Sequence, residues 1–142
     1  MSFRSVVVDT NVVVAGLLTG DAASPAARLL DGMLTGGFVF LLSPALLAEY
    51  RTVLLRPAIR ERHGLGEDEI DAILTEVVAN ATVREPPPAG AAAPEPGDQH
   101  LWDLVASERG TVLVTGDADL LGQPPEGHGV VSPATLLDRI PL

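Results

Sequence analysis

The fold is decided by the stretch Val112-Leu113-Val114-Thr115-Gly116-Asp117 and by its counterpart near the N-terminus, Val6-Val7-Val8-Asp9-Thr10-Asn11. Each stretch is an apolar, mostly β-branched run that ends in turn residues, a pattern typical of a strand buried on both faces. In open α/β sheets the functional crevice lies at the carboxyl ends of such strands. We therefore expect Asp9 and Asp117 to meet at one edge of a parallel sheet. A packed core does not need two acids there, whereas a site for a divalent metal ion does.

The length and composition are those of one globular domain, which we place at residues 1–142. No stretch reaches the roughly 18 uninterrupted apolar residues of a membrane span, and the first residues show no signal-peptide pattern. The chain contains no cysteine, which excludes disulfides, thiol catalysis and cysteine zinc sites. These features predict a cytoplasmic protein with no membrane segment.

A net charge of -10 limits how the protein can hold nucleic acid. Such a protein has no general attraction for a polyanion, so RNA would have to be held locally, by metal ions and a few arginines. A basic partner protein, by contrast, would be drawn to it. The 9 basic residues are all arginine. The lack of lysine excludes Walker A loops and Schiff-base chemistry.

Strands and helices are predicted to alternate along the chain. This order implies a three-layer α/β/α fold with a central, mostly parallel sheet of four to five strands. Serine-proline pairs at Ser24, Ser43 and Ser132 are typical helix starts, because serine caps a helix and proline suits its first turn. The predicted strands are 5–9, 38–42, 82–84, 111–115 and 130–131. The predicted helical segments are 12–18, 25–34, 45–55, one from 67, 98–107, 118–121 and one from 133, and we expect 85–97 to be an extended loop.

Four acids stand out by their positions: Asp9, Glu49, Asp98 and Asp117. Asp9 ends one strand and Asp117 follows another. Glu49 lies one turn in from the cap of a predicted helix, and Asp98 lies at the start of another. In a parallel sheet all of these positions face one edge, so the four side chains can converge. Hard oxygen ligands of this kind suit Mg²⁺ or Mn²⁺. Without an ion the carboxylates would repel one another and raise one another's pKa values.

Each acid also has a simpler explanation. Asp9 and Asp117 could each begin a turn, although the metal role is favoured for both. Taken alone, Glu49 is better explained as a solvated helix residue, and Asp98 is equally well explained as a helix cap. Asp119 is better explained as a surface or supporting acid than as a direct ligand.

Several polar residues accompany these acids. The amide of Asn11 could form a local turn or orient the neighbouring acid, and the Thr115 hydroxyl is expected to face the site. The three histidines have no spacing that indicates a common ligand set. We interpret His63, His100 and His128 as surface or loop residues.

Together these residues resemble a PIN domain over nearly the whole chain. The resemblance consists of Asp9-Thr10-Asn11 after a strand, Glu49 on a helix begun by Ser43-Pro44, the helix start Asp98-Gln99-His100-Leu101, and the block 114–121, Val-Thr-Gly-Asp-Ala-Asp-Leu-Leu. The last block, with a helix-rich insert near 60–79, is similar to a branch formed by the toxin components of toxin–antitoxin systems. The stretch Glu95-Pro96-Gly97-Asp98 departs from this branch, because many relatives carry a denser acidic stretch before the third acid.

The resemblance implies a metal-dependent endoribonuclease that uses one or two Mg²⁺ or Mn²⁺ ions and leaves 5′-phosphate and 3′-hydroxyl ends. It also implies a homodimer and, for the toxin branch, an antitoxin whose basic or arginine-bearing segment enters the acidic pocket. The metal ligands that it implies are Asp9, Glu49, Asp98 and Asp117. The supporting positions that it implies are Asn11, Thr115 and Asp119.

Other uses of a strand-end aspartate fit less well. A phosphatase of the haloacid dehalogenase type needs a second aspartate where this chain has Asn11, and both that enzyme and a response-regulator receiver need a lysine. A non-catalytic PIN-like module that binds protein or RNA remains the main alternative. Arginines for substrate are weakly specified, because surface arginines are usually solvated. Arg51 and Arg56 are the first candidates for contacting RNA and Arg28 and Arg60 are further candidates, although a solvated surface position is the better explanation for each.

Overall fold

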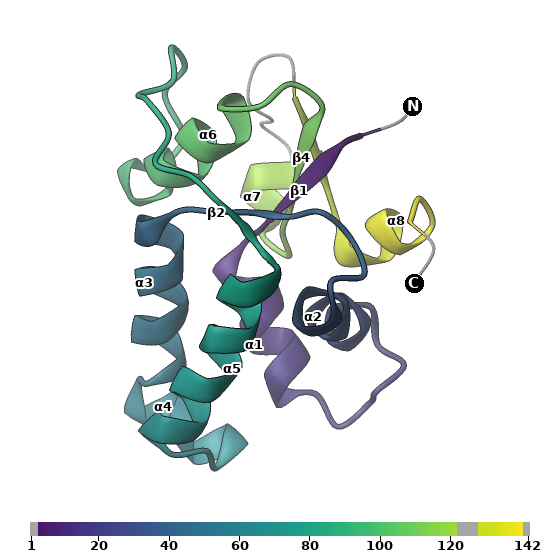
Figure 1. Ribbon diagram of the computed structural model, residues 1–142, viewed down its shortest axis with the longest axis vertical. Helices are drawn as coiled ribbons and strands as arrows, with labels where there is room; N and C mark the ends of the chain where they lie inside the picture. The colour runs from purple at the N-terminus through teal and green to yellow at the C-terminus, as the bar shows by residue number, and fades with distance from the viewer. Residues whose placement is uncertain (1–2, 122–127, 141–142) are drawn as a thin grey trace.

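The computed structural model describes residues 3–121 and 128–140, apart from the side chains of residues 118 and 119 (Figure 1). The strands are β1 (Ser5–Val8), β2 (Leu41–Leu42), β3 (Thr82–Val83), β4 (Thr111–Val114) and β5 (Gly129–Val131). The helices are α1 (Thr10–Leu18), α2 (Pro25–Thr35), α3 (Pro44–Leu54), α4 (Pro57–His63), α5 (Glu67–Asn80), α6 (Gln99–Ala106), α7 (Ala118–Leu121) and α8 (Pro133–Leu137), and a 3-10 turn covers Pro96–Asp98.

The strands pair in parallel. One sheet has the order β1-β4-β5, and β2 pairs with β3 in a second ladder. A parallel bridge between Val6 and Phe40 joins the two ladders. The chain thus moves from β1 to β2 and β3 on one side, and returns to place β4 on the other side of β1. This reversal makes the carboxyl ends of β1 and β4 the topological switch point of the sheet.

Helices cover both sides of the β1–β4 pair, which confirms the predicted α/β class. In Figure 1, α6 lies on one side of this pair, and α2 and α8 lie on the other. Helix α6 contacts both β1 and β4, while α1 packs against α2 and α3. The contact of α1 with α2 is close, because a Cβ at Gly16 would lie 2.6 Å from the carbonyl oxygen of Ala26.

Local sequence explains most helix boundaries. The hydroxyls of Ser24, Ser43 and Ser132 accept from backbone N–H groups in the first turns of α2, α3 and α8, as the serine-proline pairs predicted. Helix α2 ends at Gly36, whose φ of 73° favours glycine. All four residues of β1 and all four of β4 are buried, as the apolar runs predicted.

One element differs from the sequence prediction. The second strand is shorter than 38–42, because Val39 is 55% exposed and only Phe40 and the residues after it enter the core. After α3 the helix restarts at Pro57 as α4, which contacts both α1 and α3. Within the part of the chain that the structure describes, no helix has the length and apolar character that a membrane crossing requires.

Candidate active site

Asp9 stands at the end of β1 and caps α1. Its Oδ1 accepts from the backbone N–H of Thr10 at 2.7 Å, and its Oδ2 accepts from the Thr115 hydroxyl at 2.8 Å and from the Asn11 amide at 3.3 Å. The residue is 6% exposed. Because α1 and the residue after β4 both donate hydrogen bonds to it, the carboxylate is held in one orientation, with one edge toward the pocket.

Thr115 and Asn11 join the ends of β1 and β4. The Thr115 hydroxyl donates to Asp9 and accepts from the Asn11 amide at 3.2 Å and from the backbone N–H of Asp117 at 3.0 Å. The Asn11 carbonyl accepts from the backbone N–H of Gly116 at 3.0 Å. Both side chains therefore fix the relative positions of Asp9 and Asp117. Thr115 faces the site as expected, and of the two roles left open for Asn11 the structure shows the one that orients Asp9.

Glu49 reaches the site from α3. One carboxylate oxygen accepts from the Thr10 hydroxyl, and Nε2 of His100 lies 3.3 Å from the other. The prediction that His100 is a surface or loop residue is wrong, because its imidazole is partly buried where α6 packs against α3. Its Nδ1 is buried and has no hydrogen-bond partner among the residues that the structure describes. Glu49 is thus held by neighbours from two other elements rather than solvated.

Asp98 ends the 3-10 turn and precedes α6. The extended loop before it is tied down by Gln99, whose side chain accepts from the backbone N–H of Ala93 at 2.9 Å and donates to the carbonyl of Ala91 at 3.1 Å. Asp103 accepts from the backbone N–H of Ala89 at 2.8 Å. The loop therefore follows the surface of α6 along a fixed course, which positions Asp98 beside Glu49.

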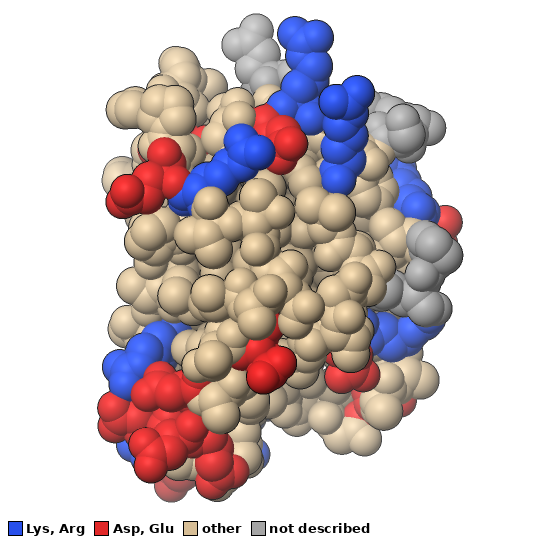
Figure 2. All heavy atoms as spheres, viewed as in Figure 1, with Lys and Arg blue, Asp and Glu red and all other residues tan. Residues whose placement is uncertain are grey.

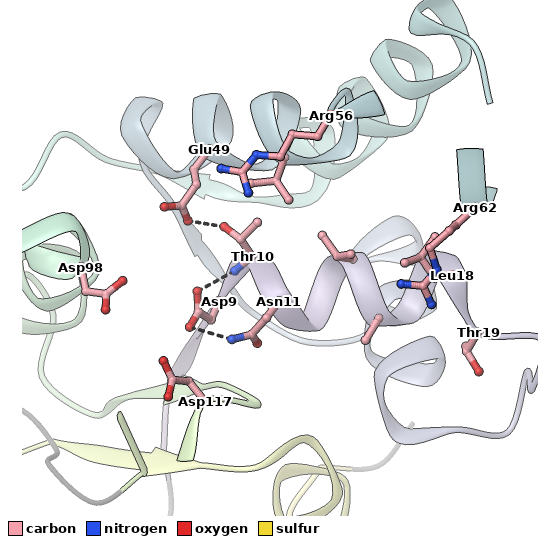
Figure 3. Close-up of a pocket in the computed structure, with 13 residues that line it drawn as sticks. Asp9, Thr10, Asn11, Leu18, Thr19, Glu49, Arg56, Arg62, Asp98 and Asp117 are labelled. Carbon is pink, nitrogen blue, oxygen red and sulfur yellow. Dashed lines mark hydrogen bonds between the residues drawn. The ribbon is translucent and has the colours of Figure 1, made fainter. Parts of the chain in front are cut away.

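All four predicted acids line one pocket, as Figure 3 shows. The pocket has a volume of about 740 Å³ and begins at the switch point between β1 and β4. Burial raises the pKa of Asp9, and the charges of Asp98 and Glu49 raise it further, against the lowering effect of its hydrogen bonds. Burial, Glu49 and Asp117 raise the pKa of Asp98. The charge of His100 lowers the pKa of Asp98, but the four carboxylates outnumber the positive groups at this end of the pocket, so it favours a bound cation or proton.

The donor set fits a hard divalent cation. It consists of carboxylate and hydroxyl oxygens, which Mg²⁺ and Mn²⁺ prefer. Among the described residues, no three acidic or histidine side chains are grouped closely enough to ligate one ion as they stand. That spacing is compatible with Mg²⁺, which keeps several waters and is usually bound directly by only one or two carboxylates.

The arginines differ from the sequence prediction. Arg51 does not line the pocket; its guanidinium pairs with Glu67 at 2.6 Å and Asp71 at 2.8 Å, which raise its pKa. Figure 2 shows acidic side chains gathered at the end of the molecule where α5 begins, and its first turn contains three acids. Arg56 lines the pocket, and so does Arg62, which sequence reasoning missed. Contact of Arg56 with RNA stays a prediction.

The remaining candidates lie elsewhere. Arg28 and Arg60 do not line the pocket. His63 contacts the Leu54 carbonyl through Nε2, away from the acids. The side chain of Asp119 lies outside the described residues, so its supporting role stays a prediction.

His100 is expected to act on metal binding through Glu49. Replacing His100 with alanine removes the ring nitrogen beside the carboxylate, and loss of such outer contacts typically weakens metal binding by about tenfold to 100-fold. Calorimetric titration with Mn²⁺ measures the effect. His100→Gln, which keeps an N–H donor, should recover part of the affinity, and His63→Ala should leave it unchanged. Equal Mn²⁺ affinity in His100→Ala and the native chain would contradict this role.

Comparison with known proteins places the chain in a class that fits this geometry. A family model described as the PIN domain matches residues 5–119, a range that includes all four acids. The chain belongs to the PIN domain family. PIN domains are generally nucleases, so the pocket lies on a nuclease-type fold. No match was found among curated proteins.

Proposed function

We propose that this protein is a metal-dependent endoribonuclease that hydrolyses RNA phosphodiester bonds with Mg²⁺ or Mn²⁺. The observation that carries the proposal is the convergence of four carboxylates at the switch point of the sheet, on a PIN domain. Raised pKa values at Asp9 and Asp98 support it, because burial and neighbouring carboxylates make their charged forms unfavourable until a cation is bound. Carboxylates that hold an ion of this kind need no protein nucleophile, because a metal-bound water can attack the phosphodiester.

The residues of the pocket would have separate roles. Asp9, Glu49, Asp98 and Asp117 would hold the ion or ions. A divalent ion held by these carboxylates would supply polarisation of the phosphodiester and a lower pKa for a bound water. Thr115 and Asn11 orient Asp9, while the Thr10 hydroxyl and His100 orient Glu49. Burial of Asp9 keeps bulk water away from the carboxylate, which strengthens its electrostatic interactions.

The test is cleavage of a labelled single-stranded RNA by the purified full chain. We expect internal cleavage in Mn²⁺ or Mg²⁺, products with 5′-phosphate and 3′-hydroxyl ends, and no cleavage in excess chelator. The alternative is a PIN-like module that binds RNA or protein without cutting. Absence of cleavage of any RNA, together with no metal-dependent stabilisation, would favour that alternative.

We further propose that the protein is the toxin component of a toxin–antitoxin module, acting in the cytoplasm as a homodimer. The resemblance of the block 114–121 to that branch supports this role, and the charge of -10 suits a basic partner that would enter the acidic pocket. Purification together with the products of adjacent genes tests it. A stably active monomer with no small partner encoded nearby would count against it.

A further inference from the structure

The pocket continues well beyond the acids. From Asp9 it runs along α1 toward α4, as Figure 3 shows. An α-helix rises about 1.5 Å per residue, so the nine residues of α1 span roughly 13 Å. Stacked nucleotides of one strand advance about 3.4 Å each. The pocket is therefore longer than one nucleotide. Its far part, beside Leu18, Thr19 and Arg62, lies beyond the acids.

The far part has an apolar floor. Val14, Ala15 and Leu18 contribute to it from α1, and Val53 contributes from α3. None of these four side chains can coordinate an ion or donate a proton. A flat apolar ligand surface, such as the face of a nucleobase, would remove this floor from water.

Two arginines flank the floor. Arg56 stands between α3 and α4 and extends toward the acidic end, and Arg62, near the end of α4, lies beside Leu18 and Thr19 (Figure 3). Among the described residues, neither guanidinium forms an ion pair or a side-chain hydrogen bond, in contrast to Arg51 on α3. A guanidinium with unused donors is well suited to bind a phosphate through two parallel hydrogen bonds.

We propose that Arg56 and Arg62, with the floor formed by Val14, Leu18 and Val53, bind the nucleotides that flank the cleaved bond of a single-stranded RNA. The arginines take backbone phosphates, and the floor takes base faces. A duplex cannot use this floor, because its base faces are stacked and its bases are paired. The inference rests on the proposed nuclease function for the position of the cleaved bond. Binding of the RNA itself can be measured without cleavage.

The experiment measures binding of a fluorescent single-stranded oligoribonucleotide to the full chain in Mg²⁺. It uses an Asp9→Asn background, so that the probe stays intact. Arg56→Ala and Arg62→Ala should each weaken binding about fivefold to tenfold. Each should also reduce the slope of log affinity against log salt concentration by about 0.7, the value for one lost phosphate contact on a single strand. The same oligonucleotide annealed to its complement should bind at least tenfold more weakly.

Arg60 provides the matched control. It lies on α4 two residues before Arg62, is exposed, and does not line the pocket. Arg60→Ala should therefore leave both affinity and salt slope unchanged. If Arg56→Ala and Arg62→Ala bind like Arg60→Ala, or if the duplex binds as well as the single strand, the subsite is wrong.

Kinetics separate this inference from the nuclease function. In the native background, Arg56→Ala and Arg62→Ala should raise KM and leave kcat nearly unchanged, as expected for contacts made equally in the ground and transition states. A protein that cleaves RNA with the same KM in these variants is a nuclease without this subsite. A protein that never cleaves but loses affinity and salt slope in both variants keeps the subsite and loses the nuclease function.

Discussion

Replacing Asp9 with asparagine is expected to reduce metal-dependent RNA cleavage by about 1,000-fold, which corresponds to about 4 kcal/mol of transition-state stabilisation. Asp9 is the most deeply buried of the four acids and the one with the most hydrogen bonds. Asparagine has the same size but no charge, so the change removes a metal ligand without leaving a cavity. Initial rates of cleavage at saturating Mn²⁺ measure the effect.

The fold should survive this substitution. Neighbouring carboxylates and burial raise the pKa of Asp9 in the folded protein, so its charge is unfavourable when no cation is bound. Removing that charge should keep the metal-free unfolding temperature equal to that of the native chain or raise it. Asp31→Asn, at an exposed position on α2, is the matched control and should cleave at the native rate. Undiminished metal-dependent cleavage by Asp9→Asn would contradict the assignment of this pocket as the active site.

Mn²⁺ is expected to stabilise the native chain strongly. At about 100 times its Kd, a ligand that binds only the folded state contributes about 2.7 kcal/mol. For a domain of this size, that corresponds to a rise in Tm of roughly 8 °C. Glu49→Gln and Asp98→Asn should lose most of the shift, and Asp31→Asn should keep it. Thermal unfolding in Mn²⁺ and in chelator provides the comparison; an equal shift when all four acids are neutralised would show that the ion binds elsewhere.

The shift should also shrink as the pH falls. In the metal-free fold, burial and neighbouring carboxylates raise the pKa values of Asp9 and Asp98 above the usual 3.8 of an aspartate. As the pH falls through these raised values toward 3.8, the folded state binds more protons than the unfolded state and is stabilised relative to it. The same protons compete with Mn²⁺ for the carboxylates. The difference in Tm between Mn²⁺ and chelator should therefore decrease over this interval.

Local sequence was sufficient to predict the strand-end acids. The runs before Asp9 and Asp117 are short and β-branched, and the rules of parallel sheets bring their carboxyl ends to one edge whatever the rest of the chain does. Helix starts at Ser24, Ser43 and Ser132 were equally local, because each serine caps the residues that follow it.

Contacts between distant elements could not be predicted in the same way. His100 meets Glu49 only because α6 packs against α3, and 51 positions separate them in the chain. Arg51 was assigned to RNA, but the acids at the start of α5 lie across from it and pair with it. Arg62 reaches the pocket because α4 folds back against α1, and no periodicity in the sequence specifies that turn.

The residue next to Glu49 has a consequence for the pocket as a whole. Tyr50 is 1% exposed, and its hydroxyl donates to the carbonyl oxygen of Val8, the residue before Asp9. Burial and the nearby carboxylates raise the pKa of Tyr50 well above its usual value, so the phenol stays neutral while the acids gain or lose protons. The hydrogen bond between Tyr50 of α3 and Val8 of β1 therefore does not depend on the charge state of the acids. Asp9 and Glu49 can therefore bind and release a cation or a proton while the backbone segments that carry them keep the same spacing.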